Sequence, residues 1–123
     1  MQICMNRVIL YVRDTTRLKE FYQTHVGFRV IEEIAGEWTV LLAGQMELAL
    51  HRAGRSFRTA QPGIGQSNAK LVFTVSSGLP ELRRSLEKTR VPVGKIKRYP
   101  GFSYSLFDGR DPEGNVFQLS EPD

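Results

Sequence analysis

Apolar and polar positions follow the same order twice along the chain. A cation opens an apolar run at 7–12, and another cation opens a matching run at 70–75, 63 residues later. Alternate side chains of such runs point to opposite faces of a strand. After a short polar break, each run is followed by apolar residues at helical spacing. The pattern therefore predicts a strand and then a helix, twice.

Capping residues indicate where these two helices begin and end. Asp14, Thr15 and Thr16 are candidate N-caps of the first helix, and Gly27 suits its end. Ser76 and Ser77 are candidate N-caps of the second helix, which cannot continue through Pro92. The apolar faces consist of Leu18, Phe21, Tyr22 and Val26 in the first helix, and of Leu79, Leu82 and Leu86 in the second.

Three strand-like segments follow each helix. They span about 28–34, 38–43 and 46–51 in the first half, and about 93–98, 102–107 and 115–120 in the second. Each half therefore reads βαβββ. We expect one α+β domain over 1–123, with modules at 6–52 and 69–121 and a connecting loop over 53–68. A repeat this long indicates a duplicated module.

The last predicted hairpin contains the most informative motif. Asp111-Pro-Glu-Gly-Asn115 suits a tight turn, and Val116-Phe-Gln-Leu119 reads as the strand after it. With Phe21-Tyr22, Val26-Gly-Phe28 and the duplicated module, this motif resembles the vicinal oxygen chelate superfamily, which includes glyoxalase I, extradiol dioxygenases and bleomycin-resistance proteins. The resemblance covers about residues 6–121. It implies paired modules whose curved sheets enclose a pocket, and a homodimer.

The resemblance also indicates where metal-using relatives hold their ligands. In this chain those positions carry Arg7, Leu48, Lys70 and Gln118, whereas relatives use histidine, glutamine or carboxylates, with glutamate at the last position. Fixed positive charges repel a divalent cation. The resemblance therefore implies a branch without metal or other cofactor, like the bleomycin-resistance proteins. A shift of one residue in the fourth strand would replace Leu48 by Glu47, and this register stays open.

We expect a ligand to contact residues on the inward faces of the strands. These predicted ligand-binding residues are Arg7, Tyr11, Trp38, Glu47, His51, Lys70, Tyr104 and Gln118. Trp38 and Tyr104 would supply planar walls, although aromatic residues on strands more often belong to the core. No catalytic residue is identified, because Cys4 has no histidine near it in the sequence.

Charge is concentrated in the middle of the chain. The net charge is +4, and residues 51–100 contain eleven Lys or Arg against two acids. Such a run most often forms a solvated surface, and no nucleic-acid-reading motif accompanies it, so no nucleic-acid partner is expected. If Arg7 and Lys70 face a cavity, a negative group must compensate their positive charges. Either Glu47 or an anionic ligand would do so.

The sequence thus favours a metal-independent protein that sequesters a planar, anionic small molecule in a dimer pocket. The alternative is a glyoxalase- or dioxygenase-like enzyme, a lyase or oxidoreductase with a rearranged or metal-free site. One cysteine, Cys4, permits no internal disulfide, and the first residues lack the features of a signal peptide. No apolar run approaches the roughly 20 residues that span a bilayer. We therefore expect a cytoplasmic protein without a membrane partner.

Overall fold

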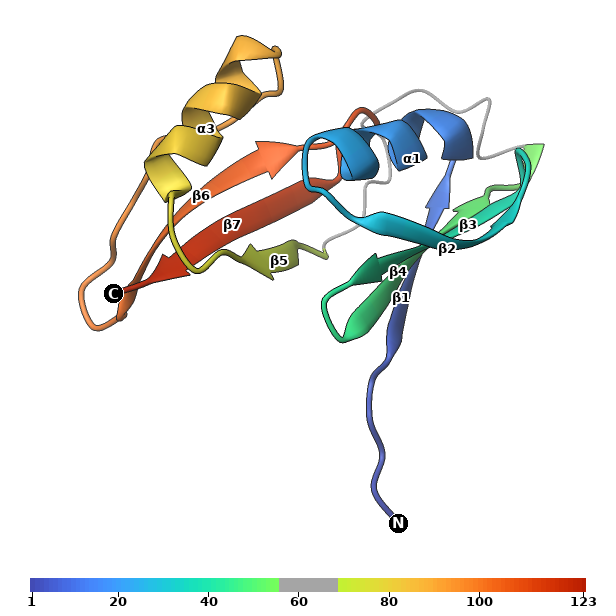
Figure 1. The fold of residues 1–123 in the computed structure, drawn as a ribbon, viewed down its shortest axis with the longest axis horizontal. Coiled ribbons are helices and arrows are strands. Elements are labelled where there is room, and N and C mark those ends of the chain that lie inside the picture. The colour runs from blue at the N-terminus through green and yellow to red at the C-terminus, as the bar shows by residue number, and fades with distance from the viewer. Residues whose placement is uncertain (56–68) are drawn as a thin grey trace. The chain divides into compact units, whose positions relative to one another are not determined.

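The computed structural model describes residues 1–55 and 69–123 and has the predicted α+β architecture (Figure 1). The chain divides into two compact units, Met1–Pro62 and Gly63–Asp123. Most of the predicted connecting loop over 53–68 lies outside the described residues. Each unit contains a small sheet and a helix.

The first unit contains all the elements predicted for the first half. Its sheet has the order β1 (Arg7–Val12), β4 (Met46–Arg52), β3 (Trp38–Ala43), β2 (Arg29–Ile34), and α1 spans Thr15–Thr24. Strands β1 and β4 are parallel, and the other pairs are antiparallel. The predicted strands are confirmed to within one residue at either end.

Helix α1 covers one face of this sheet. The Asp14 carboxylate accepts a hydrogen bond from the Arg17 backbone N–H at 3.1 Å, which makes Asp14 the N-cap among the three candidates. Lys19 of α1 donates a hydrogen bond to Glu33 of β2, so the Glu33 face of the sheet meets the helix. The core between helix and sheet includes Val12, Leu18, Phe21, Tyr22, Leu41, Leu48 and Leu50, all buried. We call the opposite face the open face: Ile9 and Tyr11 on it are 42% and 63% exposed, although Val40 and Ala49 are buried.

The described part of the second unit, residues 69–123, has three strands where four were predicted. Its sheet has the order β5 (Leu71–Thr74), β7 (Val116–Pro122), β6 (Tyr104–Arg110). The strand predicted at 93–98 is wrong, because this segment makes only two isolated bridges to β6, Val93 with Gly109 and Lys97 with Leu106. The two bridges differ by one residue in register, which interrupts the ladder.

Helix α3 (Leu79–Lys88) begins differently from the prediction. Its N-cap is Gly78, at φ +82°, rather than Ser76 or Ser77. Because glycine has no side chain, the N-cap residue cannot accept a hydrogen bond from the helix through one. The Leu79 N–H instead donates to the Glu121 carboxylate of β7 at 3.2 Å. A residue distant in sequence thus replaces the local cap. The buried residues of the unit are mainly Leu79, Leu86, Val91, Leu106, Phe107, Phe117 and Leu119.

The predicted turn between β6 and β7 is confirmed. Asp111 is buried, and its carboxylate accepts backbone N–H groups of Glu113 and Asn115, both at 2.9 Å. Gly114 adopts φ +84°, which a residue with a side chain rarely does. Within the described residues, neither helix is long and apolar enough to cross a membrane.

Candidate functional site

The register of the first sheet determines which side chains share its open face. Arg7 of β1 lies opposite Glu47 of β4, and Tyr11 lies opposite His51. Trp38 of β3 also lies opposite His51, from the other side. Directly opposite residues point to the same face of a sheet. Five predicted ligand-binding residues therefore share one face: Arg7, Tyr11, Trp38, Glu47 and His51.

The same register shows whether Glu47 or Leu48 of the fourth strand shares a face with Arg7. Leu48 lies opposite Val8, belongs to the helix-covered face and is 3% exposed. Its assignment to a ligand position is therefore wrong, and Glu47 is the residue on the Arg7 face. Both neighbouring strands constrain this register, which a single strand's sequence cannot do.

Arg7 and Glu47 form an ion pair across the two parallel strands. The guanidinium Nε donates to Glu47 Oε1 at 2.9 Å, and Nη2 lies 2.7 Å from the same oxygen. The Arg7 and Glu47 side chains are 35% and 29% exposed. Arg7 Cζ also lies 5.4 Å from the centre of the Trp38 ring, a cation–π distance.

Three aromatic rings meet beside this ion pair. The His51 ring makes edge contacts with Tyr11, at 5.3 Å between centroids, and with Trp38, at 5.6 Å. The Trp38 indole N–H donates to Glu32 Oε2 at 2.6 Å. Sequence reasoning missed Glu32, because a bulge between Val30 and Glu32 shifts the strand register and strand alternation alone does not reveal it.

In the second unit, Lys70 and Gln118 share one face of the sheet with Asp108, which was not among the predicted site residues. Lys70 Nζ donates to Asp108 Oδ2 at 3.0 Å, and Asp108 lies opposite Gln118. The predicted strand ended at 107, which left Asp108 outside it. Its place two residues after Leu106 in the alternating pattern is the signal that could have identified it.

Tyr104 is not brought close to this group. It lies opposite Pro122, four residues along β6 from Asp108, and its ring contacts Phe102 at 5.5 Å between centroids. It shares a face with Asp108 but lies at the other end of the strand.

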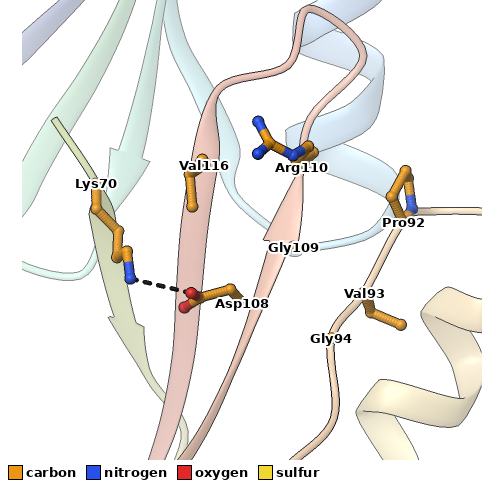
Figure 2. A pocket seen from close by; sticks show the side chains of 8 residues that line it. All are labelled: Lys70, Pro92, Val93, Gly94, Asp108, Gly109, Arg110 and Val116. Carbon is orange, nitrogen blue, oxygen red and sulfur yellow. Dashed lines mark hydrogen bonds and ion pairs between the residues drawn. The ribbon is translucent and has the colours of Figure 1, made fainter. Parts of the chain in front are cut away.

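A pocket of about 430 Å³ adjoins the Lys70–Asp108 pair (Figure 2). Its charged wall consists of Lys70, Asp108 and Arg110. The segment Pro92–Gly94 forms another wall, held to β6 by a hydrogen bond from the Gly94 N–H to the Asp108 carbonyl at 2.8 Å. All these residues belong to the second unit.

Neither open face has a donor set that fits a divalent metal. Among residues 1–55 and 69–123, no three His, Cys, Asp or Glu side chains lie close enough together to hold an ion. The Glu47 and Asp108 carboxylates each bind a cationic side chain. A metal ion there would meet a guanidinium or an ammonium group at close range.

One protein-family model matches almost the whole chain. The model described as "Glyoxalase/Bleomycin resistance protein/Dioxygenase superfamily" matches residues 5–119. The chain belongs to this superfamily. The resemblance identified from the hairpin motif and the duplicated module is thereby confirmed. No curated protein sequence matches the chain.

Solved structures of this superfamily share the fold at low sequence identity. Lactoylglutathione lyase from Agrobacterium tumefaciens is 20% identical, with 96% of this chain and 92% of that chain covered and a TM-score of 0.76. TnmS3, an antibiotic binding protein from Streptomyces sp. CB03234, is 21% identical, with 100% and 99% covered and a TM-score of 0.76. The fosfomycin resistance protein FosX from Listeria monocytogenes is 12% identical, with 100% and 94% covered and a TM-score of 0.74. These relatives include proteins described as an enzyme and as a binding protein.

Proposed function

We propose that this superfamily member binds a planar small molecule, without a metal ion, on the open face of its first sheet. The observation that carries the proposal is the cluster of Tyr11, Trp38 and His51 rings beside the Arg7–Glu47 ion pair. Tyr11 is 63% exposed, so most of its ring surface is available to a ligand. Aromatic surface beside a few polar groups is the usual composition of a small-molecule site.

Two ion pairs change the expected charge of the ligand. The expectation of an anion required Arg7 and Lys70 to lack internal partners. Glu47 and Asp108 are those partners, so neither cation requires an external anion. The proposal is therefore a planar ligand held by ring contacts and hydrogen bonds, with little preference for negative over positive charge.

Binding without conversion is favoured over catalysis by the same two ion pairs. Arg7 and Lys70, one residue of each pair, stand where the family resemblance would place metal ligands, and a paired carboxylate is a weak donor to a metal. The antibiotic-binding relative from Streptomyces supports a binding role as a precedent within the fold. The lyase relative supports the alternative, a glyoxalase- or dioxygenase-like enzyme.

Trp38 provides a direct test because it is the only tryptophan of the chain. The purified protein is titrated with 2-naphthoate, 2-naphthol and 2-naphthylmethylamine while tryptophan fluorescence is recorded. We expect saturable quenching by all three compounds, with dissociation constants within about tenfold of one another. Tyr11→Ala should weaken each by about 2- to 13-fold, the equivalent of the roughly 0.5–1.5 kcal/mol of an aromatic pair.

Tyr99→Ala is the matched control, because Tyr99 is also an exposed tyrosine but lies in the second unit. It should leave the quenching curves unchanged. Equal losses in the two variants, or no saturable quenching by any compound, would contradict the proposal. Metal-dependent conversion of a bound compound would favour the enzyme.

A further inference from the structure

The Arg7–Glu47 ion pair on the open face of the first sheet uses only part of its hydrogen-bonding capacity. Both guanidinium contacts, from Nε at 2.9 Å and from Nη2 at 2.7 Å, go to one oxygen, Glu47 Oε1. Within residues 1–55 and 69–123, no group donates to Glu47 Oε2 and no group accepts from Arg7 Nη1. A carboxylate oxygen accepts and a guanidinium N–H donates. The pair therefore presents an unused acceptor and an unused donor on the same face.

A ligand on this face can reach both unused groups. The Arg7 and Glu47 side chains are 35% and 29% exposed, and Glu47 Oε2 keeps accessible surface. Water satisfies such groups in the free protein, and a ligand that displaces this water without replacing its hydrogen bonds loses affinity. The ion pair thus favours a ligand that supplies both a donor and an acceptor over one that supplies a single group.

The ion pair adjoins the aromatic rings that would hold a planar ligand. Arg7 Cζ lies 5.4 Å from the centre of the Trp38 ring, and the His51 ring contacts Trp38 from the side. Arg7 and Tyr11 lie on the same face of β1, and Glu47 and His51 on the same face of β4. A flat bicyclic molecule can therefore lie against the rings while one of its edges meets the ion pair.

A cyclic amide, or lactam, has an edge of the required kind. Its N–H and C=O groups are neighbours and are held on the same side by the ring, so one edge donates and accepts at once. The Arg7–Glu47 pair has no net charge, and a lactam has none, so binding leaves no charge without a partner. Hydrogen bonds to ionised groups are also stronger than those between neutral groups.

We propose that the first open face selects planar molecules with a lactam edge. The ligand N–H donates to Glu47 Oε2, and the ligand carbonyl accepts from the Arg7 guanidinium. This inference rests on the proposed function, which it narrows from any planar molecule to this class. The Tyr11, Trp38 and His51 rings contribute affinity for every planar ligand, whereas the ion pair determines specificity.

Four bicyclic compounds of similar size test the proposal. 2-Quinolinone has the lactam edge, 1-methyl-2-quinolinone and coumarin keep the carbonyl without the N–H, and indole has an N–H without a carbonyl. Each is titrated into the ¹⁵N-labelled protein, and the indole N–H signal of Trp38, the only tryptophan, is followed by NMR. We expect all four to shift this signal saturably, and 2-quinolinone to bind about 5- to 10-fold more tightly than the others.

A double variant assigns this preference to the ion pair. Arg7→Met with Glu47→Leu removes the donor and the acceptor together and leaves neither charge unpaired. 2-Quinolinone should then bind like coumarin, within about twofold, because only the ring contacts remain. The matched control is Arg52→Met with Glu37→Leu, which removes another exposed ion pair of the first unit and should keep the preference. Preserved dispersion of the amide spectrum shows that a variant is folded, and Glu47→Leu alone serves if the double variant is not.

Three outcomes would contradict the proposal, and they separate it from the proposed function. Equal binding of 2-quinolinone and coumarin would show that only the rings are recognised, which leaves the proposed function intact. A preference for 2-quinolinone that survives in the double variant would place the recognised edge away from the ion pair. If no compound shifts the Trp38 signal, the proposed function fails, and this inference fails with it.

Discussion

Arg7 and Glu47 lie directly opposite each other on parallel strands and form an ion pair, with Nε 2.9 Å from Oε1. The residues that the superfamily resemblance would align with metal ligands thus include a bound cation–anion pair. A second ion pair lies in the second unit, where Lys70 binds Asp108. Each unit therefore contains one such pair of opposite charges.

The first prediction concerns the strength of the Arg7–Glu47 pair. Because both side chains are about one-third exposed, water screens them and the coupling should be small, about 0.2–1 kcal/mol. A double-mutant cycle with Arg7→Ala and Glu47→Gln, followed by urea unfolding, measures it. A coupling above about 3 kcal/mol would show that the pair is far better shielded from water than this geometry indicates.

The second prediction concerns Gly109, where the Phe117 ring leaves no room for a side chain. A Cβ at Gly109 would lie 2.5 Å from Phe117 Cζ, and Phe117 is fully buried. Gly109→Ala should therefore lower the free energy of unfolding by about 1–3 kcal/mol, the usual cost of overpacking. Thermal and urea unfolding both measure this effect.

Gly94→Ala is the control for that substitution. The nearest heavy atom to its added Cβ would be the Asp108 carbonyl oxygen at 3.7 Å, an ordinary contact. This variant should be much less destabilised than Gly109→Ala. Equal effects would mean that the crowding against Phe117 is relieved by movement of the ring.

The third prediction is a pH dependence at the contact between α1 and β2. The hydrogen bond from Lys19 to Glu33 lowers the pKa of the Glu33 carboxyl below its usual value of 4.5. A lowered pKa in the folded state stabilises the protein above the unfolded value, and this contribution is lost as the pH falls through the folded pKa. Lys19→Met should therefore destabilise the protein more at neutral pH than in acid.

NMR titration of the Glu33 carboxyl tests this cause directly. In Lys19→Met, the pKa of Glu33 should move up towards 4.5, with Thr39 Oγ1 still donating to the carboxylate at 3.2 Å. An unchanged pKa would assign the shift to Thr39 or to the rest of the fold.

The fourth prediction is that the purified, untagged protein retains far less than one equivalent of zinc, nickel, iron or manganese. The reason is that Arg7, Lys70 and Gln118 stand at the aligned donor positions. Elemental analysis after dialysis measures it. About one equivalent of any of these metals, removed together with an activity by a chelator, would favour the enzyme over the binding protein.

The fifth prediction is a homodimer. Ile9 and Tyr11 of β1, and Val72 of β5, are large apolar residues with exposures of 42%, 63% and 56%. We propose that two copies pair, because exposed apolar side chains favour association and two-fold pairing closes without further growth. Light scattering should report about twice the mass of one chain. A strict monomer at micromolar concentration would refute it.

The sequence by itself determined most of the elements and the family. Alternation in 7–12 and helical spacing in 15–24 are local patterns, and the Asp111 turn is closed by its own side chain. These features depend on residues a few positions apart, so a pattern along the chain contains them. Strand parity likewise groups Arg7 with Tyr11, and Glu47 with His51, within their own strands.

Tertiary structure alone decided the partners of these residues. The choice of Glu47 over Leu48 required the register with β1, and the loss of the predicted strand at 93–98 followed from its offset against β6. Asp108 became the partner of Lys70, and Glu121 the cap of α3, over separations of 38 and 42 residues. Such pairings depend on how strands align across a sheet, and one strand's sequence does not specify its neighbour's register.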